Sequence, residues 1–249
     1  MEEKQMEKKE EKKEEKKEVG IVTYVANGLE VKLSPSIVQN YIVGNGSKIT
    51  MAEYKFFSEL CRARGLNPFL KEAYCIKYGN QPATIVVSKD VIEQRAETFP
   101  QYDGKESGII VRVKATGEIV ERNGCFWMKE YEDLVGGWCR VHRKDRSTPE
   151  YMSVPLEEVA QRKSDGTLNA NWTNKPATMV EKVAKVRALR AAFPKDFCGM
   201  YIADEMPVSD VAKADASNFE SDDTDGGMKY TVNEENPSVI SAEYTEVSE

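Results

Sequence analysis

Residues 176–193 read PATMVEKVAKVRALRAAF, and this stretch decides the fold. Its large apolar residues recur at offsets of four, seven and fourteen and form one stripe of a helix with 3.6 residues per turn: Met179, Val183, Val186 and Phe193. Alanines form a small-residue face on the opposite side, at 184, 188 and 191. Pro176 stands where proline is favoured, in the first turn. The pattern predicts a long core helix that neighbouring elements approach from two sides.

Further helices are marked by their caps. Thr50 and Glu53 form a capping-box pattern, and Gly65 follows the apolar stripe that begins at Tyr54, so a helix is expected between them. Ser88 is the expected cap of a second helix that runs through Thr98. Two short helices are expected, one from Ser36 and one over 155–161.

Strands are expected between these helices. Asn27-Gly28 is a two-residue hairpin signal between the runs 21–25 and 29–33, and a second hairpin is expected from 73–78 and 84–87 around the turn at 79–82. A meander follows, with turns at Thr116-Gly117, Asn123-Gly124 and Gly136-Gly137. Its expected strands are 109–113, 118–122, 125–129, 138–143 and 151–154. Because strands and helices are segregated, the predicted class is α+β, with small and mostly antiparallel sheets packed by helices.

Charge divides the chain into three parts. The chain has 249 residues and a net charge of −7, but residues 1–18 hold eight Glu and seven Lys, and residues 207–249 hold eleven acids and two lysines. Residues 19–206 hold 26 bases and 23 acids. We expect a charged N-terminal tail over 1–18, one core domain over 19–206 and a flexible acidic tail over 207–249. Residues 140–195 hold twelve bases against six acids, a distribution typical of a phosphate-binding surface.

Metal and membrane sites are not indicated. Five cysteines and one histidine include no CxxC pair, and Cys139 and His142 are interpreted as ordinary strand residues instead of zinc ligands. No apolar run approaches the roughly 20 residues that a membrane span needs. The expected location is the cytoplasm.

Enzyme motifs are equally weak. GNGSK at 44–48 has the wrong order of residues for a phosphate loop. Glu30 and Lys32 have the ExK spacing of some metal-dependent nucleases, which leaves that activity as an alternative. The sequence predicts no enzymatic activity and no cofactor.

Arg190 lies on the apolar stripe of the long helix, where an unpaired guanidinium is costly, so it needs a carboxylate or a phosphate. Spacing alone leaves both partners open, and it leaves the flanking Lys182 and Lys185 either as phosphate ligands or as a solvated face. The same choice applies to the basic end of a strand at Arg140, Arg143, Lys144 and Arg146. Trp172 is expected either to stack on a base or to anchor a loop.

Five blocks, read in order, resemble the RecT family of phage recombinases, which is related to the lambda Beta protein. They are GLNPFLKEAYCIKYG at 65–79, IVVSKDVIEQRA at 85–96, YDGKESGIIV at 102–111, VGGWCRVHRK at 135–144 and MVEKVAKVRALRAAFP at 179–194. Each block is weak alone, but five in this order are specific. The family's long closing helix starts after a tryptophan and a proline and ends in an arginine followed by a phenylalanine, a pattern matched by Trp172, Pro176, Arg190 and Phe193.

The resemblance implies ATP-independent binding and annealing of single-stranded DNA in homologous recombination, in a bacterial host cell. It implies a homo-oligomer, either a ring or a helical filament, with a partner exonuclease and the host single-strand-binding protein as candidate partners. Two rival interpretations stay open, a passive single-stranded-DNA-binding protein and a structural phage protein. The residues expected to contact DNA are Lys71, Tyr74, Lys77, Arg140, Arg143, Lys144, Trp172, Lys175, Lys182, Lys185, Arg187 and Arg190.

Overall fold

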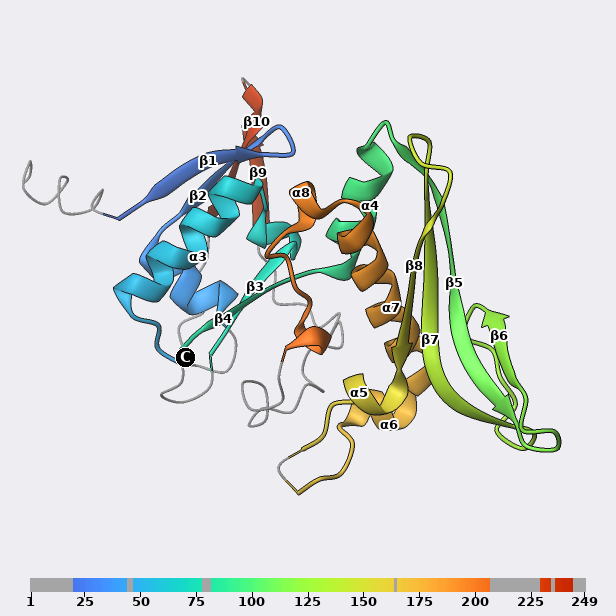
Figure 1. Cartoon of the computed structure of the whole chain (residues 1–249). Helices are drawn as coiled ribbons and strands as arrows, with labels where there is room; N and C mark the ends of the chain where they lie inside the picture. Colours follow the sequence, from blue (N-terminus) through green and yellow to red (C-terminus); the bar gives the residue numbers. More distant parts are fainter. Residues whose placement is uncertain are drawn as a thin grey trace, which may run out of the picture. The chain divides into compact units, whose positions relative to one another are not determined.

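The structure is a computed structural model that describes residues 20–43, 47–77, 82–163 and 165–206, together with the backbone of two strands at 229–233 and 236–243. The chain forms two compact units, one of residues 1–83 and 224–249 and one of residues 84–223. We call them the first unit and the second unit, in that order (Figure 1). Residues 79–81 of the turn expected at 79–82, the tract at 1–18 and most of the tract at 207–249 lie outside the described residues.

The first unit begins with the expected hairpin. β1 (Val22–Ala26) and β2 (Leu29–Leu33) are antiparallel, with Val22 opposite Leu33. Asn27 and Gly28 both have positive φ, 52° and 79°, as a type I′ turn requires. Two strands from the closing tract, β9 (Lys229–Asn233) and β10 (Asn236–Glu243), complete a sheet of order β1-β2-β10-β9, in which β10 runs parallel to β2.

Helix α3 (Met51–Arg64) covers this hairpin. The predicted capping box of Thr50 and Glu53 is present, and Gly65 ends the helix with φ 56°. Tyr54 and Phe57 are buried, and the Tyr54 hydroxyl donates to the Leu33 carbonyl at 2.6 Å, which ties the helix to β2. The unit also contains α2 (Pro35–Ile37), η1 (Val38–Ile42), η3 (Pro68–Leu70) and β3 (Ala73–Ile76).

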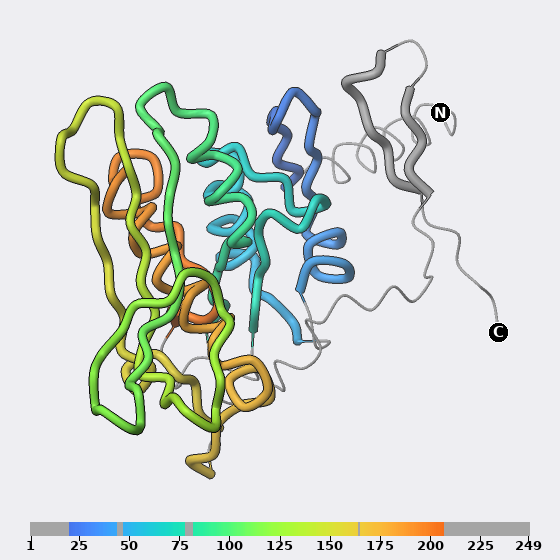
Figure 2. Tube along the Cα trace, turned by 90° about the vertical axis from the view of Figure 1, so that its right-hand side faces the viewer, coloured from blue at the N-terminus to red at the C-terminus, as the bar shows by residue number. Residues whose placement is uncertain are grey.

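The second unit is a four-stranded antiparallel sheet packed against helices (Figure 2). Its strands are β5 (Tyr102–Val113), β6 (Ile119–Asn123), β7 (Glu132–Arg143) and β8 (Glu150–Pro155), in the order β6-β5-β7-β8. Helix α7 (Pro176–Ala192) lies along one face of the sheet, as the apolar stripe predicts, and ten of its residues are buried. The remaining elements are β4 (Thr84–Val87), α4 (Lys89–Thr98), α5 (Leu156–Val159), α6 (Ala170–Asn174), α8 (Pro194–Phe197) and η4 (Ala203–Glu205). This mixture of antiparallel sheet and helix confirms the α+β class.

The expected meander is wrong in two respects. Gly136 and Gly137 do not form a turn but lie inside β7, where a Cβ on Gly137 would stand 2.7 Å from the Val180 carbonyl oxygen of α7. Gly137 therefore allows the helix to approach the strand closely, whereas a Cβ on Gly136 would stand 2.7 Å from the Val154 carbonyl oxygen of β8. The expected strand at 125–129 is also absent, because both edges of β5 are already paired, one with β6 and the other with β7. The intervening segment instead crosses from one edge of β5 to the other, and Phe126 is 78% exposed on it.

No helix in the described ranges has the length and apolar character that a membrane span requires.

Candidate nucleic-acid interface

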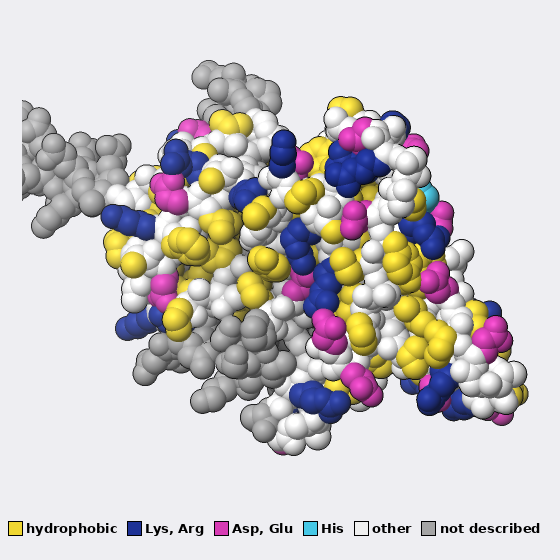
Figure 3. Space-filling model, in the orientation of Figure 1, with side chains coloured by type: hydrophobic (Ala, Val, Ile, Leu, Met, Phe, Trp, Pro, Cys, Tyr) yellow, Lys and Arg dark blue, Asp and Glu magenta, His cyan; other side chains and the backbone are white. Residues whose placement is uncertain are grey.

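The basic excess of the core lies in the first unit. Residues 20–83 contain seven Lys and Arg against four Glu, whereas residues 84–206 contain nineteen bases and nineteen acids. Thus the bases that cluster in sequence over 140–195 are balanced by acids elsewhere in the second unit. In the view of Figure 3, its basic and acidic side chains are interspersed over the surface. A phosphate-binding surface on the second unit therefore depends on individual cations and on the acids that they pair with.

Helix α7 carries three cations that pair with acids of α5 and η4. We call Lys182, Arg187 and Arg190 the α7 cation row. Lys182 Nζ lies 2.5 Å from Asp204 Oδ2, and Arg187 Nη1 lies 2.8 Å from Glu158 Oε1 on α5. The row is therefore partnered by carboxylates throughout.

Arg190 is the most enclosed member of the row. Its guanidinium donates to Glu205 through both Nη atoms, with Nη1 at 2.9 Å from Oε2, and to the Met200 carbonyl at 3.0 Å. It also lies over the Tyr201 ring, 4.5 Å from the centroid. Arg187 reaches the same carboxylate, with Nε 3.7 Å from Glu205 Oε1. The charge that the sequence placed on an apolar stripe is thus satisfied by a carboxylate within the second unit.

Lys185 belongs to a separate cluster under the sheet. Its ammonium lies 3.0 Å from Glu181, which also accepts from the Ser107 hydroxyl at 2.6 Å. Glu93 of α4 lies 3.8 Å from Lys185 and 3.0 Å from Lys105 of β5. Burial would raise the pKa of Glu93, but these lysines outweigh it and hold the pKa below its usual value. This cluster joins α4, β5 and α7 through ion pairs in which Lys185 takes part.

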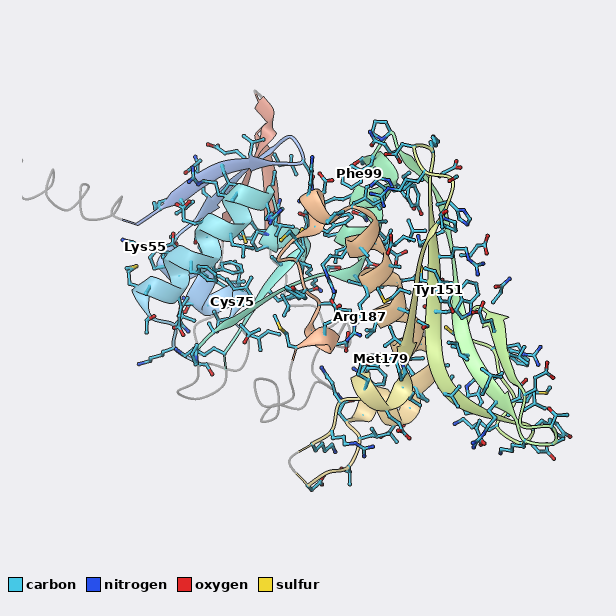
Figure 4. All side chains as sticks on the ribbon, in the orientation of Figure 1. Lys55, Cys75, Phe99, Tyr151, Met179 and Arg187 are labelled. Atoms are coloured by element: carbon cyan, nitrogen blue, oxygen red, sulfur yellow. The ribbon has the colours of Figure 1, made fainter. Side chains whose placement is uncertain are left out.

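Arg140 lies on β7 between two aromatic rings. Its guanidinium carbon is 5.3 Å from the Trp138 ring and 5.5 Å from the Tyr151 ring, and Nη1 lies 3.2 Å from Glu106. Tyr151, labelled in Figure 4, donates its hydroxyl to Glu121 at 2.6 Å. Side chains alternate along a strand, so Arg140 and Cys139 point to opposite faces of the sheet. Arg140 is therefore separated from the α7 cation row by the sheet.

Arg143 and Lys144 differ in their surroundings. The Arg143 guanidinium donates to the carbonyl of Ala192, the last residue of α7, and pairs with Asp145 at 2.6 Å. A cation at this position satisfies a carbonyl that the helix leaves unpaired and complements the helix dipole. Lys144 is exposed, and its backbone amide donates to Gln101 at 2.8 Å. Of these two residues, Lys144 is the one whose charge is exposed to solvent.

Trp172 and Lys175 lie at the start of the long helix. Trp172, on α6, is 1% exposed, so its indole packs in the core and cannot stack on a base without rearrangement. Within the described residues its indole N–H has no hydrogen-bond partner. Lys175 is exposed and stands at the N-terminal boundary of α7.

The three candidates of the first unit are Lys71, Tyr74 and Lys77. Lys77 is 7% exposed and pairs with Glu53 at 2.7 Å, so its charge is used inside the unit. Tyr74 is half-buried on β3, and Lys71 is exposed with φ 58°. Of these, Lys71 is the one whose cation is open to solvent.

Among the residues that the structure describes, no group of three His, Cys, Asp or Glu is arranged to hold a metal ion. Cys139 and His142 both lie in β7, as ordinary strand residues, and burial raises the pKa of the Cys139 thiol to about 12. Glu30 lies 3.4 Å from Lys32 on the first hairpin.

Sequence reasoning missed Asp204 and Glu205, the acids that partner the α7 cation row. They follow the helix by more than ten residues, beyond the three or four residues over which helical spacing is informative. The only sequence signal is the need of Arg190 for an anion, which does not identify the anion.

The model of the RecT family matches residues 30–218, which is most of the chain and includes all five resembling blocks. No curated protein matches the chain.

Proposed function

Because the chain belongs to the RecT family, we propose that it binds single-stranded DNA and anneals it to a complementary strand without nucleotide hydrolysis. The observation that carries this proposal is the family match over residues 30–218. The expected products are a protein-coated single strand and then an annealed duplex intermediate. No enzymatic step is needed, and no cofactor is proposed.

The chemistry of annealing fits a protein without a catalytic centre. Base pairing is downhill once the strands meet, since stacking supplies about 1.4 kcal/mol per base-pair step. The obstacles are the repulsion between two phosphate backbones and the folding of each strand on itself. Cations that neutralise and extend the backbone lower both obstacles and leave the base edges free.

The proposed phosphate contacts are the exposed Lys71, Lys144 and Lys175, together with the half-buried Arg140 and the α7 cation row. Lys77, Arg143 and Lys185 are proposed to support the fold through their ion pairs. Trp172 is proposed to brace the loop before α7, since its ring is buried.

One chain of this size contacts only a few nucleotides, whereas a stable register needs many. We therefore propose that several copies assemble along the strand, as a ring or a helical filament. A partner exonuclease that produces single strands and the host single-strand-binding protein are the proposed protein partners. The proposed location is the cytoplasm of a bacterial host.

A fluorescence annealing assay tests the proposal against passive binding. Two complementary dye-labelled oligonucleotides are mixed with and without the protein, and energy transfer reports duplex formation. Annealing faster than the spontaneous rate is expected. A protein that binds each strand but slows pairing is a passive binder, and a protein that does not bind at low salt has a different function.

A further inference from the structure

A short acidic segment covers the α7 cation row. Asp204 and Glu205, which we call the clasp, lie on the 3-10 helix η4. Lys182 pairs with Asp204, and both Arg187 and Arg190 reach Glu205. Figure 4 shows Arg187 on the side of α7 that faces this segment. Two adjacent carboxylates thus engage all three cations of the row.

The clasp is held in place by its own neighbours. Ile202, just before it, is 1% exposed, and Gln161 donates to the Ala203 carbonyl at 2.9 Å. Tyr201 accepts from the Val87 amide at 2.9 Å, and the Glu205 amide donates to Ile202 at 3.1 Å. The two carboxylates are therefore presented to the row by an ordered segment.

The exposure of the partners is uneven. The side chains of Asp204 and Glu205 are 11% and 3% exposed, whereas those of Lys182, Arg187 and Arg190 are 29%, 29% and 18% exposed. An anion from solvent can therefore approach the cations, whereas the side chains of the two acids are largely shielded from solvent. Two guanidinium groups pair with the Glu205 carboxylate, which is also how arginines bind a phosphate group.

We propose that the clasp is an internal phosphate mimic, which occupies the α7 cation row in the DNA-free chain and is displaced when phosphates of single-stranded DNA bind there. This inference rests on the proposed function. It makes DNA binding at the row a competition between two carboxylates of the chain and the phosphates of the strand. The displaced segment connects α8 to the acidic tract that begins at residue 207, so its release changes the path of the chain between them.

The chain offers a matched control for testing this competition. Glu132 and Asp133 are also an adjacent acid pair of the second unit, and they partner Arg122 at 2.6 Å and Arg112 at 2.8 Å. Glu132 has a buried side chain and Asp133 a more exposed one, as in the clasp. The variants D204N/E205Q and E132Q/D133N therefore change the net charge equally, and each releases cations of the same unit.

The measurement is the dissociation constant for a dye-labelled oligothymidylate, at several salt concentrations, for the full chain and both variants. We expect D204N/E205Q to bind at least about threefold more tightly than E132Q/D133N, the size of effect that freeing partly exposed ion pairs gives. Equal affinities of the two variants would overturn the proposal, because any gain would then come from net charge alone. A full chain that fails to bind at low salt would overturn the proposed function and the clasp with it.

Hydrogen exchange supplies a test that needs no substitution. On addition of oligothymidylate to the full chain, the amides of Ile202 and Glu205 are expected to exchange faster, since displacement of the clasp breaks their hydrogen bonds. Slower exchange of these amides in a chain that binds the oligonucleotide would show that the clasp stays in place.

Discussion

Replacing Arg190 by methionine tests whether its ion pair holds the end of α7. The substitution keeps an unbranched side chain but removes the cation that faces Glu205, which is 3% exposed. Removing one partner of a buried pair costs about 3–5 kcal/mol. Because Arg187 remains 3.7 Å from the same carboxylate and Arg190 is itself 18% exposed, we place the loss of unfolding free energy at about 2–3 kcal/mol.

The assay is urea unfolding followed by circular dichroism, applied as a double-mutant cycle. R190M, E205L and R190M/E205L are compared with the unchanged chain. The double variant is expected to recover at least about 1.5 kcal/mol relative to the sum of the single losses, since it leaves no buried charge unpaired. If R190M costs less than about 0.5 kcal/mol, or if the two losses simply add, the pair does not stabilise the second unit and the reasoning is refuted.

Three further outcomes follow from the fold. Burial would raise the pKa of Glu53, but the hydrogen bond from Lys77 and those from backbone amides lower it to about 2. The ionised carboxylate therefore stabilises the fold above about pH 4.5, and this stability is lost as the pH falls toward 2. The urea midpoint of E53Q should vary less with pH across that window than the midpoint of the unchanged chain. Gly137→Ala should lower the unfolding free energy by about 1–3 kcal/mol, because its Cβ would meet the Val180 carbonyl at 2.7 Å, and an unchanged melting temperature would contradict that packing. Glu30→Ala should leave annealing intact, whereas magnesium-dependent DNA cutting that this variant loses would instead support a nuclease.

Local sequence signals predicted the helices well. The capping box at Thr50 and the glycine at 65 fix α3, and the apolar stripe fixes α7, because these signals act within one or two turns of a helix. The Asn27-Gly28 turn likewise fixes the first hairpin. In each case the chemistry that decides the structure lies within a few residues.

Long-range contacts could not be predicted in this way. The Gly136-Gly137 pair is typical of a turn, but Gly137 lies against the Val180 carbonyl of α7, more than forty residues away in sequence. The partners of the α7 cations are also distant in sequence, so spacing alone could not decide between carboxylate and phosphate. In the structure the partners of Lys182 and Arg190 are carboxylates.

The most direct test of the central claim is the annealing rate in EDTA and without ATP. One dye-labelled oligonucleotide is first coated with the protein, and its complement is then added. Duplex should form faster than for bare strands, and the gain should fall as salt rises and screens the phosphate contacts. A coated strand that pairs no faster than a bare one would contradict the claim that this chain is an annealing protein.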